Sequence, residues 1–207
     1  MDKLLTKIKA CRHCVTDPEG APLPHVPRPV LRVSKTARIG VFGQAPGVRV
    51  HASGKPFTDP SGVRLRQWMD VDEATFYDKR LIAIVPMGFC FPGLDAKGGD
   101  LPPRRECAPL WRDKVLAAMP DLKIILLVGA YAQKWHLKKR TGRTLTETVK
   151  RWREFAEQPT TPGSPKYFAM PHPSWRNNAW LKANPWFEAE LLPVLRSEIA
   201  ACVDNPA

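Results

Sequence analysis

The sequence predicts an α/β protein, a single domain with a central, mostly parallel four-stranded sheet flanked by helices. Short apolar runs typical of buried strands alternate with segments of helical period along the chain. Strands that alternate with helices imply right-handed crossovers and therefore parallel pairing. The length of 207 residues and the 43% hydrophobic content suffice for one sizeable core. We therefore treat residues 1–207 as one domain that begins with a cysteine- and proline-bearing segment, 1–37.

Four runs of apolar and β-branched residues are the expected strands. They cover residues 38–42, 81–85, 123–128 and 167–170. The run 123–128, KIILLV, is the clearest, because a strand covered on both faces is apolar throughout and does not alternate. These runs predict the sheet at the centre of the domain.

The expected helices show apolar residues at intervals of three and four. They cover residues 1–10, 61–69 with Ser61 as the cap, 106–118, 129–137 and 145–155. Proline and glycine crowd the segments 16–29 and 89–103, which predicts surface loops there. The aromatic segment 180–187 is expected to pack into the core.

The charge of the chain favours a polyanionic partner. Lys and Arg number 32 against 20 Asp and Glu, a net charge of +12. Nucleic acid, an anionic membrane surface and acidic small molecules all remain open, as does a basic protein without such a partner. No stretch approaches the roughly 20 apolar residues of a membrane span, and the start lacks the apolar core of a signal peptide. We expect a cytoplasmic protein that does not enter membranes.

Five cysteines in a chain of this size favour a metal or redox site. Two of them form the pair Cys11-x2-Cys14, which fits a ligand site in a reducing compartment better than a disulfide framework. Cys202 is the cysteine expected to stand apart. In a parallel sheet, ligands bind beyond the carboxyl ends of the strands. The GQAPG loop (43–47), the loop with Cys90 and the segment 171–178 are therefore expected to gather.

Two loops carry a resemblance to a known family. GQAPGVRVHASGKPFTDPSG (43–62) and HPSWRNN (172–178) resemble the two signature motifs of the uracil-DNA glycosylase superfamily. The resemblance is closest to bacterial and archaeal branches that carry an iron-sulfur cluster, although GQAPG is an atypical first motif. In those branches, four cysteines fall at the positions of Cys11, Cys14, Cys90 and Cys107.

The resemblance implies a DNA-repair glycosylase that flips uracil out of single- or double-stranded DNA and hydrolyses its N-glycosidic bond. Such an enzyme acts as a monomer and starts base excision repair. One alternative is a member of the superfamily that binds uracil or DNA without turnover. Another is an unrelated nucleotide-binding α/β protein, which the absence of a P-loop and of a dinucleotide glycine fingerprint disfavours.

The resemblance also implies roles for individual residues. Phe57 is placed like the phenylalanine that stacks on uracil, and His172 like the histidine that donates a hydrogen bond to the uracil oxygen as negative charge develops. The implied uracil pocket consists of Gly43, Gln44, Ala45, Phe57, Met87 and His172. The implied DNA contacts are Ser174, Arg176, Asn177 and Arg49, with Trp175 beside them.

This sequence departs from the family pattern at its carboxylate. Many relatives have Glu where this chain has Gln44, and a neutral amide cannot act as a base. Asp59 is then the leading carboxylate, with capping of the turn 59–62 as its alternative role. Gln44 is expected to orient the water or contact the base. The implied catalytic set is Asp59, His172 and Gln44.

A second departure is a missing base-reading Asn. Relatives that discriminate uracil commonly place it at the end of the second strand, where this chain has Ile-Val-Pro-Met-Gly at 84–88. Backbone groups near Met87, Gly88 and the GQAPG loop are expected to replace it. The spacing of the four cysteines does not distinguish between three alternatives, which are a four-iron four-sulfur cluster, structural zinc and no metal. The resemblance favours the cluster, in a structural role without redox catalysis.

Overall fold

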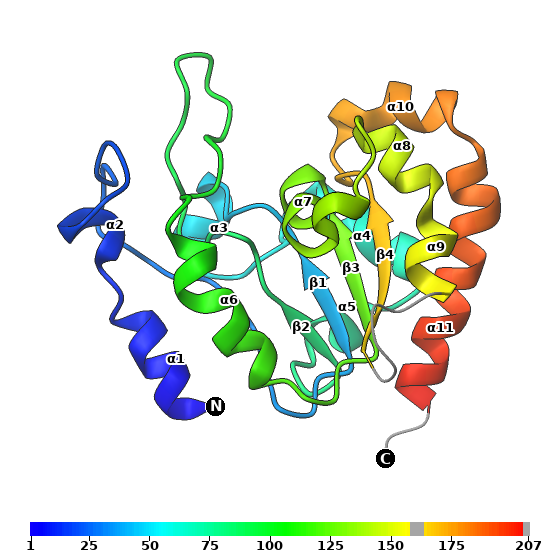
Figure 1. Cartoon of the computed structure of the whole chain (residues 1–207), viewed down its shortest axis with the longest axis horizontal. Coiled ribbons are helices and arrows are strands. Elements are labelled where there is room, and N and C mark those ends of the chain that lie inside the picture. The colour runs from blue at the N-terminus through cyan, green and yellow to red at the C-terminus, as the bar shows by residue number, and fades with distance from the viewer. Residues whose placement is uncertain (158–163, 205–207) are drawn as a thin grey trace.

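The computed structural model describes residues 1–157 and 164–204 and contains one four-stranded sheet (Figure 1). Its order is β2-β1-β3-β4, and every neighbouring pair is parallel. The strands are β1 (Ile39–Phe42), β2 (Ile82–Ile84), β3 (Ile124–Val128) and β4 (Lys166–Met170). All four expected strands are thus confirmed to within two residues at each end, and the sheet is wholly parallel.

The sheet is buried on both faces, which explains its continuous apolar strands. In the register, Ile39 of β1 lies beside Ile82 of β2 and Ile124 of β3. Every residue of β1, β2 and β3 is buried. Because neither face meets water, no polar residue alternates along these strands.

Helices surround the sheet in the places that the sequence predicted. In Figure 1, α1, α2 and α6 lie on the left of the sheet, and α8 to α11 lie on its right. The elements that match expectation are α1 (Asp2–Lys9), α4 (Pro60–Met69), α6 (Cys107–Ala117) and α7 (Ala130–Leu137). No helix in the described part of the chain is both long and apolar enough to cross a membrane.

Two helix predictions need correction. The expected helix 145–155 is divided at Arg151 into α8 (Leu145–Lys150) and α9 (Trp152–Glu157). Arg151 leaves the helical path and bonds the Arg140 carbonyl and the Glu154 carboxylate. Ser61 is not the cap of α4, because the helix begins at Pro60. Proline suits a first helical position, where its missing N–H would have no partner in any case.

Several helices were not predicted, and all of them except α11 are short. They are α2 (His13–Thr16), α3 (Val48–Ser53), α5 (Glu73–Tyr77), α10 (Asn178–Ala183), the π-helix η3 (Phe187–Leu191), α11 (Leu192–Asp204), and the 3-10 turns η1 (Lys138–Arg140) and η2 (Trp175–Asn177). The expected packing of segment 180–187 is confirmed, since Phe187 is fully buried and both of its tryptophans pack against the core.

The strand order explains where a ligand site forms. The chain leaves β1 for β2 on one side, whereas β3 pairs on the other side of β1, so the connections diverge at the carboxyl end of β1. The loop that follows β1 therefore opens into a crevice. Figure 1 shows the long loop before α6 and the segment after β4 rising at this end of the sheet.

Candidate functional site

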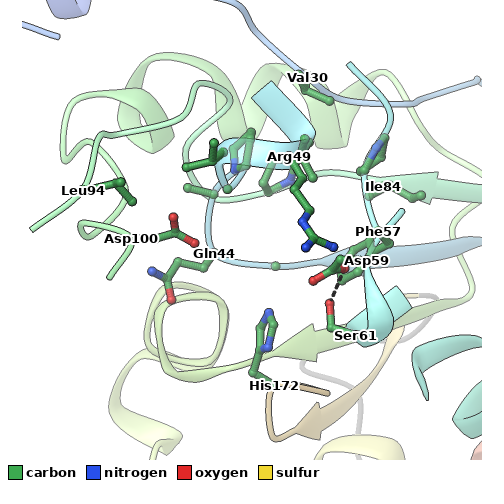
Figure 2. A pocket seen from close by; sticks show the side chains of 18 of the residues that line it. Val30, Gln44, Arg49, Phe57, Asp59, Ser61, Ile84, Leu94, Asp100 and His172 are labelled. Atoms are coloured by element: carbon green, nitrogen blue, oxygen red, sulfur yellow. Dashed lines mark hydrogen bonds between the residues drawn. The ribbon is translucent and has the colours of Figure 1, made fainter. Parts of the chain in front are cut away.

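A cavity of about 310 Å³ lies at the carboxyl end of the sheet. Its walls include the GQAPG loop, Phe57, Asp59, the end of β2 at Ile84 and Pro86, and His172 (Figure 2). It adjoins a groove of about 650 Å³ that continues past Ser174, Trp175, Arg176 and Asn177. Gln44, Ala45, Asp59 and His172 line both spaces. The loops expected to gather at this edge do so.

Phe57 forms one wall of the cavity in an unusual backbone conformation. Its φ is +56°, in the left-handed region that costs a residue with a side chain about 1 to 3 kcal/mol. Gly43 lies near the tip of the ring, since a methyl group built on it would be 3.8 Å from Phe57 Cζ. A flat, apolar surface next to bare backbone is suited to stacking on a planar heterocycle.

The Phe57 loop is held by two residues that sequence reasoning had not singled out. The Tyr77 hydroxyl donates to the Pro56 carbonyl at 2.7 Å and to the Phe57 carbonyl at 3.1 Å. The Phe57 carbonyl packs directly against Gly62, because a Cβ atom built on Gly62 would lie 1.8 Å from the carbonyl oxygen. Only glycine fits there. The phenyl ring also meets Phe76 edge to face, at 6.0 Å between centroids.

Asp59 faces the cavity and is not used as a helix cap. It occupies the N-cap position of α4, but its side chain makes no capping hydrogen bond. Instead, the Ser61 hydroxyl donates to Asp59 Oδ1 at 2.7 Å. The Asp59 carboxylate therefore does not cap the backbone N–H groups at the start of α4. One oxygen is oriented by Ser61, and the group lines the cavity as a charge.

His172 enters the cavity from the segment after β4 (Figure 2). The Ser174 backbone N–H donates to His172 Nδ1 at 3.3 Å, so the neutral ring carries its proton on Nε2. Asn177 Nδ2 donates to the His172 carbonyl at 2.7 Å and fixes the backbone. Burial lowers the pKa of His172 below its usual 6.5, and the nearby Asp59 carboxylate opposes this shift. The ring is therefore a neutral hydrogen-bond donor at neutral pH.

The expected role of Met87 does not fit the structure. Met87 does not line the cavity, and its sulfur lies 3.2 Å from Arg112 Nη2 in the core. Its N–H donates to the Gly43 carbonyl at 2.9 Å, and the Gly88 N–H donates to the Gln44 carbonyl at 3.0 Å. Both N–H groups are engaged in hydrogen bonds that join the loops after β1 and β2. They are therefore not available to form hydrogen bonds with a base.

The groove carries the residues expected to contact DNA. Trp175 is 72% exposed, and the Arg176 guanidinium lies 6.0 Å from its ring centroid. Arg64 Nη1 donates to the Ser174 carbonyl at 3.2 Å, which ties this segment to α4. Arg49 lies apart from them on α3, where it points into the cavity and also borders the groove (Figure 2). Its charge is thus beside the base site.

The cavity contains a second carboxylate, Asp100, that sequence reasoning missed. It belongs to the segment 89–103, which the sequence predicted as a loop without assigning Asp100 a function. Asp100 follows two glycines in a loop near the end of a strand, and that position was the available signal. Burial raises the pKa of Asp100, Asp59 raises it further, and Arg176 opposes both effects.

Four cysteines converge on one small cavity beside α6. Cys11, Cys14, Cys90 and Cys107 all line it, whereas Cys202 does not. The pKa of Cys14 is raised to about 11 and those of Cys90 and Cys107 to about 12, mainly by burial and in part by neighbouring cysteines. The Phe89 N–H donates to Cys107 Sγ at 3.3 Å. Such a hydrogen bond stabilises a metal-bound thiolate.

These thiols are not arranged around a single point. Among the residues that the structure describes, no group of three or more His, Cys, Asp or Glu side chains is close enough to hold one metal ion. A tetrahedral zinc site requires four sulfurs about 2.3 Å from one centre. Cys14, Cys90 and Cys107 are buried beside this cavity, and Cys11 is half-buried there.

The sequence was compared with models of known protein families. The model described as the uracil DNA glycosylase superfamily matches residues 32–196. This span contains the cavity, the groove, Cys90 and Cys107, but begins after Cys11 and Cys14.

Proposed function

Because the chain belongs to the uracil-DNA glycosylase superfamily, we propose that it is a uracil-DNA glycosylase that hydrolyses the N-glycosidic bond of uracil flipped out of DNA. Membership supports a glycosylase-like function on DNA in general. The proposal of uracil as the substrate depends mainly on one observation. Phe57, Asp59 and His172 face one cavity that opens into a groove with exposed Trp175 and Arg176.

The cavity supplies the interactions that an extruded pyrimidine requires. A base inside a duplex is out of reach of side chains, so it must leave the stack and be held elsewhere. The Phe57 ring near Gly43 offers a stacking surface. Trp175, exposed beside the groove, is suited to occupy the space that the base leaves, while Arg176 attracts phosphate.

Cleavage of the N-glycosidic bond separates positive from negative charge, and the cavity contains a group suited to stabilise each. As the bond breaks, positive charge grows on the deoxyribose and negative charge grows on the departing base. Asp59, oriented by Ser61, stabilises the sugar cation electrostatically. His172 donates from Nε2 to the uracil oxygen as it becomes negative. A neutral imidazole suits this role, because it stabilises the anion without cancelling the charge of Asp59.

Excision from a synthetic oligonucleotide tests the function directly. The purified protein is incubated with a labelled strand that contains one uracil, and abasic sites are then cleaved with alkali. We expect cleavage at the uracil in single- or double-stranded DNA and none at a matched thymine. Tight binding without cleavage would instead identify the non-catalytic alternative that Gln44 and the missing Asn left open.

We also propose a four-iron four-sulfur cluster held by Cys11, Cys14, Cys90 and Cys107. Their convergence on one cavity supports it. When bound, the cluster supplies a structural crosslink of high stability. Cys11 precedes α2 of the amino-terminal segment and Cys14 lies within it, whereas Cys90 and Cys107 bracket the loop that borders the base cavity. The cysteines thereby fix that loop to the amino-terminal segment.

A further inference from the structure

The loop between Cys90 and Cys107 contains a firmly built hairpin. Leu94 and Asp100 face each other in an antiparallel bridge. At the turn, Asp95 Oδ1 accepts hydrogen bonds from the N–H groups of Lys97 at 2.8 Å and Gly99 at 2.9 Å. These bonds define the conformation of the loop. Asp100 is therefore held at a definite place.

That place is the boundary between the cavity and the groove, both of which Asp100 lines. Its carboxylate lies against Gly47, where a methyl group would be 3.0 Å from Asp100 Oδ2. In the view of Figure 2, Asp100 and Gln44 are drawn on one side of the cavity, Asp59 on the other side and His172 below them. The two carboxylates thus approach a bound nucleotide from different walls.

The surroundings of Asp100 differ from those of Asp59. No hydrogen bond or ion pair to the Asp100 carboxylate is present within residues 1–157 and 164–204, whereas Asp59 accepts a bond from Ser61. The charged groups around the same space are Asp59, Arg49, Arg64 and Arg176, and His172 is the other titratable group there. Burial and Asp59 raise the pKa of Asp100, and Arg176 opposes them. A free carboxylate with a raised pKa is a stronger base than an ordinary one.

Hydrolysis needs such a group, because the water that attacks the sugar must lose a proton. Gln44 cannot accept one. We propose that Asp100 is the catalytic base of the reaction, accepting the proton of a water that Gln44 orients toward C1′ of the deoxyribose. This inference rests on the proposed glycosylase function.

The step balances without any further reactant. The water oxygen forms a bond to C1′, and the C1′–N1 bond breaks with its electron pair passing to uracil. The water proton passes to the Asp100 carboxylate. Protonated Asp100 then returns it to the uracil anion or to solvent. The products are free uracil and an abasic site.

The test compares single-turnover excision by the parent protein, Asp100→Asn and Asp95→Asn. Asp100→Asn keeps the shape but removes the proton acceptor, so the rate should fall about 100-fold or more. Its affinity for uracil DNA should stay within about threefold, since binding loses no steric contact. Asp95 is the matched control, because it lies in the same hairpin, also interacts with Arg176 and does not line the cavity. Asp95→Asn keeps its turn acceptor and should retain the parental rate.

Two further readouts distinguish a base from a structural residue. In the parent, the rate should decline on the acid side with a pKa above the 3.9 of an ordinary Asp, and Asp100→Asn should lose this decline. Gln44→Glu, introduced into Asp100→Asn, places a carboxylate beside the lost one and should restore the rate at least tenfold. Circular dichroism checks that each variant is folded.

The outcomes separate the two proposals. If the parent excises uracil and Asp100→Asn excises it equally fast, the base is another group and the inference is overturned. An equal loss in Asp95→Asn also overturns it, because the hairpin rather than the carboxylate would then matter. A folded parent that leaves uracil in place refutes the glycosylase function itself, and the role of Asp100 with it.

Discussion

The Ser61 hydroxyl donates a 2.7 Å hydrogen bond to Asp59 Oδ1 across the first turn of α4. This bond uses one carboxylate oxygen and turns the group toward the cavity, so Ser61 acts as a positioning residue for the charge. A side chain at the N-cap would ordinarily bond the helix backbone instead. The carboxylate is thus held in an arrangement that serves the site rather than the helix.

Substitutions at this pair should affect excision to different degrees. Asp59→Asn preserves the shape but removes the charge, so the rate should fall by roughly two powers of ten or more while DNA binding survives. Ser61→Ala leaves the charge but not its orientation and should cost about tenfold. Single-turnover kinetics measure both. If Asp59→Asn excises uracil at the rate of the parent protein while Gln44→Ala is inactive, then Gln44 rather than Asp59 has the catalytic role.

His172→Ala should lower the excision rate about as much as Asp59→Asn, because it removes the donor to the departing base. The double variant should lose less than the two penalties combined, since both groups act on one transition state. Strict additivity would contradict this coupling. The lowered pKa of His172 also predicts no titration of this ring between pH 7 and 9 in the parent's rate profile.

Removal of the Phe57 ring should weaken base capture. Phe57→Ala forfeits about 1 to 3 kcal/mol of stacking, a loss of roughly 5- to 150-fold in affinity for a strand with uracil. Tyr77→Phe is the matched test of the loop, because it deletes only the hydroxyl that bonds the Pro56 and Phe57 carbonyls. It should impair excision less than Phe57→Ala. A folded Phe57→Ala variant with full affinity would refute the stacking role.

The purified protein should be brown and contain about four iron per chain. Cys14→Ser or Cys90→Ser should lose the colour and the iron, and should lower thermal stability. Cys202→Ser is the control, because Cys202 does not line the four-cysteine cavity. Metal analysis by mass spectrometry decides the result. One zinc per colourless chain would show that the ligands hold a different metal.

Acid should destabilise the fold partly through His136. Burial lowers the pKa of His136 to about 3, and its Nε2 has no partner. In the unfolded chain, His136 is protonated near pH 6.5, whereas in the folded chain it is protonated only near pH 3. The free energy of unfolding therefore falls as the pH drops from about 6.5 to about 3. The slope from this group approaches 1.4 kcal/mol per pH unit. Urea unfolding of His136→Phe at pH 7 and pH 5 should show a smaller difference than the parent does.

The sequence by itself determined the four strands of the sheet and the helices α1, α4, α6 and α7. A strand buried on both faces must be apolar throughout, so runs such as 123–128 are visible without any knowledge of their neighbours. The motif loops were also recognisable, because the segments around Phe57, Asp59 and His172 resemble the signature motifs of the uracil-DNA glycosylase superfamily. The shorter helices were not, because α3 and α5 have too few residues for a periodic signal.

Only the tertiary structure decided which groups share the cavity. Asp100 lies 41 residues beyond Asp59 in the chain and belongs to no motif, yet the hairpin and the bare backbone of Gly47 bring it into the same space. Met87 shows the opposite case, since its N–H joins two loops and its side chain lies in the core. The physical reason is that hydrogen-bond satisfaction and steric room depend on partners distant in sequence, and local patterns do not contain them.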